Sequence, residues 1–217
     1  MGREFWSATG DEILMRKGKR QETKMMRHTF AKVCGLTTEQ QIDWAVELGY
    51  DAIGIVVSPR SKRYCSPETA VALAKHAQGR VSTFVVALRY DEVSSIAAHF
   101  DIVQLYEMAS IPNHAFSSAT PPSQPTAMQY FFYDASVGSG IFNEIPTWVQ
   151  SVPGKVVIAG GLNAENVQGV IERYSPYGVD VSSGVETAPG IKSQEKMLDF
   201  IKAVRCFPPA LQNGLGQ

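Results

Sequence analysis

The fold of this chain is indicated first by residues 155–190, which read KVVIAGGLNAENVQGVIERYSPYGVDVSSGVETAPG. Residues 155–159 are an apolar run rich in β-branched side chains, which predicts a buried strand that stops at the pair Gly160-Gly161. Residues 178–181 predict a second strand, which stops at Ser182-Ser183-Gly184. The stretch therefore contains one unit twice: a buried strand followed directly by a loop with glycine.

These two loops have the composition of a phosphate site. Glycine directly after a strand lets backbone N–H groups approach a ligand closely, and several N–H groups directed at one point bind phosphate. In a barrel of eight parallel strands, the loops after the seventh and eighth strands frequently form such a site. We therefore predict that Gly160, Gly161, Ser183 and Gly184 bind a phosphate group. For either loop alone, the alternative that its glycine only makes a tight turn stays open.

Outward from this stretch, predicted strands and helices alternate along the chain. Runs of β-branched and other apolar residues predict strands, and apolar residues at helical spacing predict helices. No hairpin signal separates neighbouring strands, so the expected fold is α/β, a (β/α)8 TIM barrel with a parallel sheet. The predicted strands cover residues 29–33, 51–57, 81–88, 102–105, 129–133, 155–159 and 178–181, and the predicted helices cover 39–48, 67–76, 91–98, 142–152, a segment beginning at 163, and 194–204.

The middle and the two ends of the chain depart from this alternation. Residues 106–128 contain four prolines among serines and alanines without a clear apolar period, so we expect the fifth βα unit to be abbreviated or irregular. Residues 1–27 are basic and predict a flexible arm; such an arm can contact RNA, but a solvated arm is the simpler interpretation. Residues 206–217 predict a loose tail, which leaves residues 28–205 as one barrel domain.

Composition limits the classes of partner. The chain has 217 residues, 44% of them hydrophobic and 19% charged, and its net charge of -1 provides no basic field for nucleic acid. No apolar run approaches the roughly 20 residues needed to cross a bilayer. Three cysteines, at positions 34, 65 and 206, have neither disulfide nor zinc spacing. We expect a cytoplasmic monomer that acts on a small molecule, without a metal.

Motifs at the expected strand ends resemble one family. KVCGLT begins at Lys32, SPRSKRYCSPE at Ser58, FFYDA at Phe131, AGGLNAENV at Ala159 and VDVSSGVETAPGIK at Val179. In this order they resemble phosphoribosylanthranilate isomerase, an enzyme of tryptophan biosynthesis, and the resemblance covers about residues 29–205. KVCGLT and VDVSSGVE are its most specific parts.

The resemblance implies an Amadori rearrangement of N-(5-phosphoribosyl)anthranilate to 1-(2-carboxyphenylamino)-1-deoxyribulose 5-phosphate, with no cofactor. By the motifs, Asp134 is the acid that opens the ribose ring and Cys34 is the base that removes the C2 proton. A thiol that acts as a base must be partly ionised, so Cys34 needs an unusual setting. Arg63 corresponds to the residue that holds the anthranilate carboxylate, and Asp180 to one that binds the sugar or braces the phosphate loop.

Alternatives stay open for the residues and for the activity. Taken alone, Cys34 could be a small core residue, Asp134 a turn cap and Arg63 a solvated loop charge. Where the family usually has Gln-Leu-His-Gly, this chain has Gln104-Leu105-Tyr106-Glu107, and the loop after Asp134 also departs from the family pattern. The alternatives are therefore a related phosphosugar aldose–ketose isomerase and a non-catalytic phosphosugar-binding protein.

Overall fold

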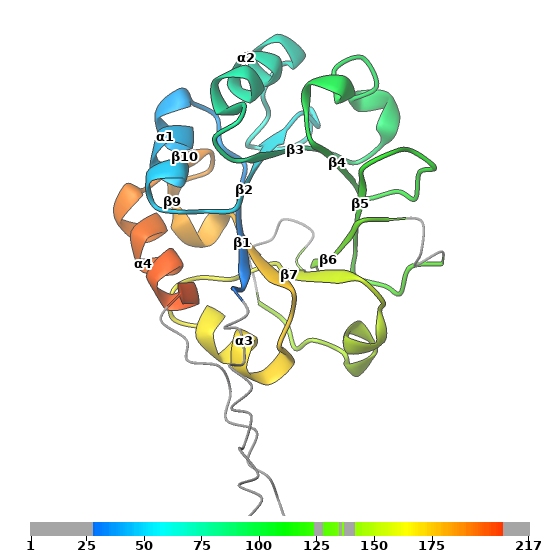
Figure 1. Ribbon diagram of the computed structural model, residues 1–217, viewed down its shortest axis with the longest axis vertical. Helices are drawn as coiled ribbons and strands as arrows, with labels where there is room; N and C mark the ends of the chain where they lie inside the picture. Colours follow the sequence, from blue (N-terminus) through cyan, green and yellow to red (C-terminus); the bar gives the residue numbers. More distant parts are fainter. Residues whose placement is uncertain (1–27, 124–127, 135, 137–141, 206–217) are drawn as a thin grey trace, which may run out of the picture.

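A closed barrel of eight parallel strands forms the centre of the molecule (Figure 1). The computed structural model describes residues 28–123, 128–134, 136 and 142–205. Each strand pairs with its neighbour in sequence, and β1 closes the barrel by pairing with β8, as predicted for a (β/α)8 barrel. The barrel strands are β1 (Phe30–Cys34), β2 (Ala52–Val56), β3 (Ser82–Ala87), β4 (Ile102–Leu105), β5 (His114–Ser118), β6 (Tyr130–Asp134), β7 (Lys155–Ala159) and β8 (Gly178–Val181).

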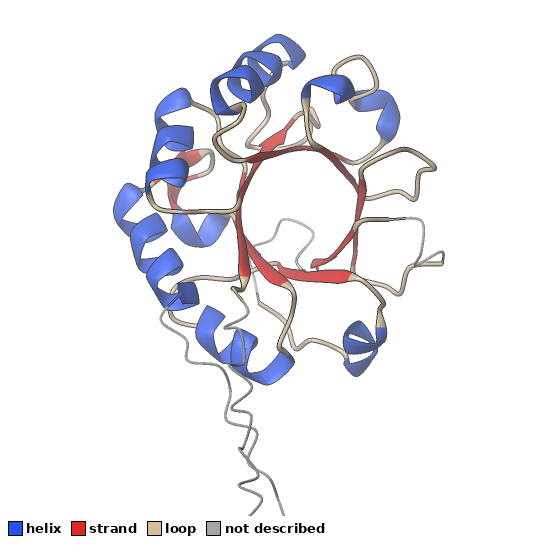
Figure 2. Cartoon of the chain, in the orientation of Figure 1, coloured by secondary structure: helices blue, strands red, loops and turns tan. Residues whose placement is uncertain are grey.

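The described residues form four α-helices outside the strands, mostly beside one half of the barrel (Figure 2). They are α1 (Glu39–Glu47), α2 (Pro67–Ala77), α3 (Val167–Tyr174) and α4 (Gln194–Arg205). Helix α1 begins where the Thr38 side chain accepts a hydrogen bond from the Gln41 N–H. Helix α2 begins at a Ser66 cap followed by Pro67, a residue suited to the first helical turn. These starts are the ones that the sequence predicts.

Two predicted helices are wrong. Residues 91–98 form only the two 3-10 turns η1 (Tyr90–Glu92) and η2 (Ala97–His99), because Ser94-Ser95 has low helix propensity and the Glu92 side chain accepts from the Leu88 N–H. Residues 142–152 form only the 3-10 helix η3 (Thr147–Ser151), because Pro146 lacks the N–H that a longer helix needs.

A third helix begins later than predicted. The side chain of Asn163 accepts hydrogen bonds from the N–H groups of Glu165 and Asn166, which makes a turn in place of the first helical turn. Helix α3 therefore begins at Val167. The helix N-terminus that the sequence predicts at residue 163, next to the loop Gly160-Gly161, is therefore not found there.

The fifth unit is abbreviated, as predicted. Strand β5 spans His114–Ser118, and the described residues between β5 and β6, 119–123 and 128–129, contain no helix. In Figure 1 loops lie outside the barrel beside β5, where a regular barrel has a helix. The predicted basic arm (1–27) and loose tail (206–217) lie outside the described residues, as do residues 137–141 after Asp134.

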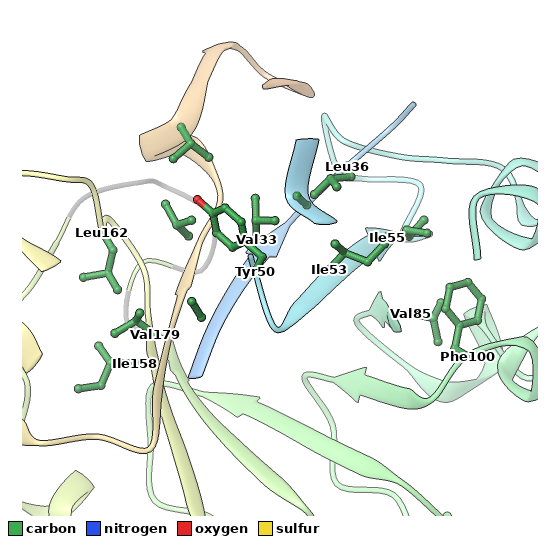
Figure 3. Packing of buried hydrophobic residues seen from close by; sticks show 14 of the residues in the cluster. Val33, Leu36, Tyr50, Ile53, Ile55, Val85, Phe100, Ile158, Leu162 and Val179 are labelled. Carbon is green, nitrogen blue, oxygen red and sulfur yellow. The ribbon is translucent and has the colours of Figure 1, made fainter. Parts of the chain in front are cut away.

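Buried side chains form two layers on the two faces of the strands. Outward-facing residues such as Val33, Ile53, Val85 and Val179 pack between the strands and the helices, as the sticks in Figure 3 show. Inward-facing residues fill the barrel interior and include Phe84, Phe132 and Val157. Because side chains alternate along a strand, Lys32 and Cys34 of β1 both point inward while Val33 points outward. No helix in the described part of the chain is long and apolar enough to cross a membrane.

Candidate active site

A cavity of about 750 Å³ opens at the C-terminal ends of the strands, which is where barrel enzymes bind substrates. Its wall brings together most of the predicted site residues, although they come from distant parts of the chain. Only Gly184 of the predicted set is not part of the wall. The predicted residues that line the cavity are Cys34, Arg63, Asp134, Gly160, Gly161, Asp180 and Ser183.

Cys34 is the last residue of β1, and its side chain is buried at the base of the cavity. Its partner in β2 is Gly54, where a Cβ atom would lie 2.7 Å from the Cys34 Sγ and 3.0 Å from the Lys32 Nζ. Glycine at this position therefore provides the space that both side chains occupy. Burial raises the pKa of the Cys34 thiol, and the positive charge of Lys32 opposes this rise. The thiol of the free protein is thus less easily ionised than the sequence analysis expects.

Lys32, which the sequence analysis did not select, lies beneath Cys34 and is completely buried. Its Nζ is 3.1 Å from the Oδ1 of Asp180 and lies over the rings of Phe84 and Phe132, at 5.4 and 5.1 Å. Burial alone would lower the pKa of Lys32, but the charges of Asp180 and Cys34 outweigh it and the pKa is raised. Lys32 is therefore a cation fixed beside the predicted base.

Asp180, which is expected from its motif to bind the sugar or brace the phosphate loop, accepts a hydrogen bond from Lys32. Its side chain is buried at the end of β8 and faces the cavity. Burial raises the pKa of Asp180, against the effect of Lys32. From this position Asp180 can contact a sugar in the cavity, while its hydrogen-bond partner Lys32 lies on β1.

Asp134 is the last residue of β6 and is held through both carboxylate oxygens. Oδ2 accepts from the Tyr106 hydroxyl at 2.8 Å, and Oδ1 accepts from the Ser136 N–H at 3.0 Å and the Ser136 hydroxyl at 2.7 Å. Both Tyr106 and Ser136 also line the cavity. The carboxylate is thus directed at the space that a substrate occupies.

Arg63 lies in the loop after β2 and forms a two-point ion pair with Glu186. Its Nε and Nη2 donate to the two oxygens of Glu186, each at 2.7 Å. The buried Lys192 Nζ also lies 2.7 Å from the Oε1 of Glu186. Burial would raise the pKa of Glu186, but Arg63 and Lys192 hold it below its usual value. The edge of the Arg63 guanidinium that carries Nε is therefore already occupied, and the edge formed by Nη1 and the second N–H of Nη2 faces away from Glu186.

The two glycine loops lie against each other. Gly160 and Gly161 have positive φ angles of 85° and 70°, which favour glycine. At Gly184 a Cβ atom would lie 2.0 Å from the carbonyl oxygen of Leu162, so the loop after β8 packs directly on the loop after β7. The cavity wall includes Gly160, Gly161 and Ser183. Gly184 lies outside the wall and allows the two loops to pack against each other.

The segment after β8 adds three short elements before α4, which begins at Gln194 as predicted. It consists of the three-residue 3-10 helix η4 (Ser183–Val185), the strands β9 (Glu186–Ala188) and β10 (Ile191–Lys192), and only then α4. Strands β9 and β10 form an antiparallel pair, and Glu186, Thr187 and Ala188 of β9 line the cavity. The hairpin therefore forms part of the cavity wall.

Three functional candidates escaped the sequence analysis: Lys32, Tyr106 and Glu186. Lys32 was quoted within KVCGLT, and alternation along the strand would have placed it on the same face as Cys34. Tyr106 stood out only as a departure from the family pattern and Glu186 only as part of a quoted motif, because their partners are 28 and 123 residues away in sequence. In the described residues, no group of three or more His, Cys, Asp and Glu side chains could hold a metal ion.

Comparison with known proteins assigns the family. A family model described as N-(5'phosphoribosyl)anthranilate (PRA) isomerase matches residues 127–203. The chain is also 33% identical, over 222 residues, to the N-(5'-phosphoribosyl)anthranilate isomerase of Ralstonia nicotianae, and the match covers 86% of this chain and 96% of that protein. The chain belongs to the phosphoribosylanthranilate isomerase family. The resemblance seen in the motifs is thus confirmed.

Solved structures of the phosphoribosylanthranilate isomerase family have the same fold. TrpF from Jonesia denitrificans superimposes with a TM-score of 0.72 at 30% identity, covering 82% of this chain and 97% of that one. A phosphoribosyl anthranilate isomerase solved in complex with reduced 1-(o-carboxyphenylamino)-1-deoxyribulose 5-phosphate gives 0.66 at 27% identity, with coverage of 82% and 100%. The family fold therefore extends over the barrel of this chain.

Proposed function

We propose that this chain catalyses the Amadori rearrangement of N-(5-phosphoribosyl)anthranilate to 1-(2-carboxyphenylamino)-1-deoxyribulose 5-phosphate, with Asp134 as general acid and Cys34 as general base. The observation that carries the proposal is that Cys34, at the end of β1, and Asp134, at the end of β6, line one cavity together with the glycine loops. A chain that only bound a phosphosugar would need the loops but not this pair. Membership in the isomerase family supports the same conclusion.

Asp134 and Cys34 act one after the other in the reaction. The Asp134 carboxylic acid protonates the ribose ring oxygen, the bond from C1 to that oxygen breaks, and the nitrogen lone pair forms an iminium at C1. The Cys34 thiolate then removes the proton from C2, and the electrons of that C–H bond form the double bond of an enolamine. Protonation at C1 and loss of the hydroxyl proton at C2 give the ketone. Proton transfers accomplish each step, so we propose that no cofactor takes part.

The protonation states constrain how the pair works. The reaction starts from a thiolate and a carboxylic acid, which together hold one proton. Because burial raises the pKa of Cys34, the thiolate that the reaction needs forms less readily in the free protein than from an exposed thiol. The rate should therefore fall at high pH, when the last proton leaves the pair, and at low pH, when the pair takes up a second one.

Substrate binding uses the two sides of the cavity. We propose that Gly160, Gly161 and Ser183 bind the phosphate through their N–H groups. Arg63 would receive the anthranilate carboxylate through Nη1 and the second N–H of Nη2, since Glu186 occupies the other edge of the guanidinium. The related isomerase that was solved with a reduced product analogue carries the same two functional groups, a phosphate and a carboxylate, on its ligand.

A direct assay with purified protein tests the proposal, and complementation of a tryptophan auxotroph that lacks this isomerase provides a second test in cells. Turnover of N-(5-phosphoribosyl)anthranilate together with growth without tryptophan supports the assignment. Turnover of a different phosphoribosyl amine, with no growth, would instead identify a related phosphosugar isomerase. Phosphosugar binding without turnover of either substrate would identify a binding protein.

We extend the proposal to the oligomeric state and the cellular compartment of the protein. Cys34 and Cys65 are both free thiols, as a reducing compartment requires. The proposed acid, the proposed base and the glycine loops all lie in the wall of one cavity of this chain. We therefore propose that the chain acts as a monomer in the cytoplasm, which light scattering of the purified protein and fractionation of cells can test.

A further inference from the structure

Tyr106 directly follows β4, and its hydroxyl reaches across the barrel mouth to Asp134 at the end of β6. Tyr106 Oη donates to Asp134 Oδ2 at 2.8 Å, and both residues line the cavity. Strand β5 lies between β4 and β6, so this hydrogen bond does not follow from strand pairing. It is a specific contact between a side chain of one strand end and the proposed acid of another.

The second carboxylate oxygen is fixed independently. Ser136 donates to Asp134 Oδ1 through its N–H and its hydroxyl. The backbone of Gly160 lies so close that a Cβ atom there would be 2.7 Å from the same oxygen. With one oxygen held by Ser136 and the other by Tyr106, the carboxylate cannot rotate freely, and Tyr106 decides how Oδ2 is presented to the cavity.

Tyr106 remains a donor over the whole working range of pH. Burial raises the pKa of Tyr106 well above its usual value, and the negative charge of Asp134 adds to the effect. The hydroxyl therefore supplies a hydrogen bond and does not exchange its proton with Asp134. A donor of this kind stabilises a carboxylate more than a carboxylic acid, because a hydrogen bond to a charged acceptor is the stronger one.

Other ionisable groups face the same pair. Cys34 of β1 and Asp180 of β8 act electrostatically on Tyr106, Tyr133 of β6 interacts with Asp134, and Lys32 acts through Asp180. Hydroxyl and N–H groups donate the hydrogen bonds to the two oxygens of Asp134 described above. Removal of the Tyr106 hydroxyl thus takes away one hydrogen bond to Asp134 without changing the net charge of the site.

We propose that Tyr106 is a positioning residue of the isomerase reaction: its hydroxyl orients the Asp134 carboxylate and stabilises the charge that develops on it as the proton passes to the ribose ring oxygen. The inference rests on the proposed function. Ring opening converts the Asp134 carboxylic acid into a carboxylate, and Tyr106 binds the carboxylate more strongly. The contact therefore contributes more to the transition state than to the bound substrate.

Tyr106→Phe is the test, because it removes the hydroxyl and keeps the ring that lines the cavity. We expect kcat to fall at least about tenfold with KM nearly unchanged, the pattern of an interaction made in the transition state. The acid limb of the kcat/KM profile, where the acid–base pair takes up its second proton, should shift because the pair loses the hydrogen bond that Tyr106 donates.

Two further variants make the result specific. Tyr130→Phe removes a hydroxyl at the opposite end of β6 and should leave the profile unchanged. Tyr106→His restores a ring donor and should recover part of kcat while adding a titration near neutral pH. If Tyr106→Phe does not fold, as judged by thermal unfolding, Tyr106→His carries the test, and a wild-type profile in that variant overturns the inference.

The outcomes separate the inference from the function on which it rests. If the wild type does not turn over N-(5-phosphoribosyl)anthranilate, the proposed function is wrong. If the wild type is active and Tyr106→Phe keeps the acid limb in place, Tyr106 is only part of the wall. A loss confined to KM would likewise overturn the positioning role.

Discussion

The Lys32 Nζ lies 3.1 Å from the Asp180 Oδ1 inside the barrel, and both side chains are almost completely buried. This ion pair links the first and last strands, β1 and β8, directly below the cavity. Lys32 also acts on Cys34, where its charge opposes the effect of burial on the thiol. Lys32 thus provides a fixed positive charge beside the proposed base, and the Asp180 carboxylate opposes part of its effect on the thiol.

Lys32→Met should make the Cys34 thiol harder to ionise, because it removes the nearest positive charge. We expect the alkylation rate of Cys34 at pH 8 and kcat each to fall at least about tenfold, which corresponds to a pKa rise of about one unit. The alkylation rate is measured in a background with Cys65→Ser and Cys206→Ser, so that Cys34 is the only thiol.

Lys155→Met is the matched control, since Lys155 contacts the Tyr130 and Tyr177 rings at the other end of the barrel. It should leave both rates unchanged. Equal alkylation rates in the Lys32→Met variant and the wild type, over the full pH range, would show that Lys32 has no influence on the thiol.

Gly54→Ala should displace Cys34, since the new Cβ atom would lie 2.7 Å from Sγ and 3.0 Å from the Lys32 Nζ. A displacement of the base by a few tenths of an ångström or more should lower kcat by about an order of magnitude. Gly169→Ala is the control: this glycine lies in α3, and a Cβ atom there contacts nothing within 4 Å. Wild-type kcat in Gly54→Ala would mean that the position of Sγ is not critical.

Gly184→Ala should weaken the phosphate site although Gly184 does not face the cavity. Its Cβ atom would lie 2.0 Å from the Leu162 carbonyl oxygen, so the two glycine loops must separate. We expect KM and the inhibition constant of inorganic phosphate to rise together by at least about tenfold, as for a lost charge-assisted contact. Unchanged inhibition by phosphate would place the anion site elsewhere.

Asp51 should contribute stability that depends on pH. It accepts from the Ala31 N–H at 2.7 Å and from Arg205 at 2.8 Å, which joins β1 to α4. Although burial acts to raise it, these contacts, with His28, lower the pKa of Asp51. A carboxyl with a lowered pKa in the folded state stabilises at pH values above the unfolded pKa of about 3.9, and this stability is lost as the pH falls through the folded value.

Asp51→Asn should therefore lower the free energy of unfolding at pH 7 by about 1–3 kcal/mol, with a smaller difference below about pH 4. Denaturant unfolding across this pH range measures the effect. Asp91→Asn is the control, because Asp91 is exposed and pairs only with the exposed Arg89 at the surface. A difference that stays constant with pH would argue against the ionised Asp51 as its source.

The fold was predictable from the sequence because its signals are local. Seven of the eight barrel strands follow from apolar runs such as those at Phe30 and Lys155, and the helix starts at Thr38 and Ser66 follow from their capping residues. Strand β5 was missed, since its five residues, HAFSS, alternate weakly and lie between prolines. The helix predicted after β3 does not form because Ser94-Ser95 has low helix propensity. The helix predicted after β6 does not form because Pro146 lacks an N–H.

The site was predictable only in part. Cys34 and Asp134 could be selected because each ends a strand within a recognisable motif, and the barrel fold brings strand ends together. The partners that set their chemistry are non-local: Tyr106 reaches Asp134 across β5, and Glu186 reaches Arg63 from a hairpin that no sequence signal marked. The direction of the thiol pKa also depends on burial, which a sequence does not supply.

The central claim is that Cys34 is the base of the rearrangement, and kcat of Cys34→Ser tests it most directly. General base catalysis typically contributes 10²- to 10⁴-fold, so kcat should fall at least about a hundredfold, while the affinity for a reduced product analogue stays close to that of the wild type. Cys65→Ser, which changes a buried thiol bonded to the Leu36 carbonyl, should keep wild-type kcat. A Cys34→Ser variant with near wild-type kcat would show that Cys34 is a core residue and that the mechanism is wrong.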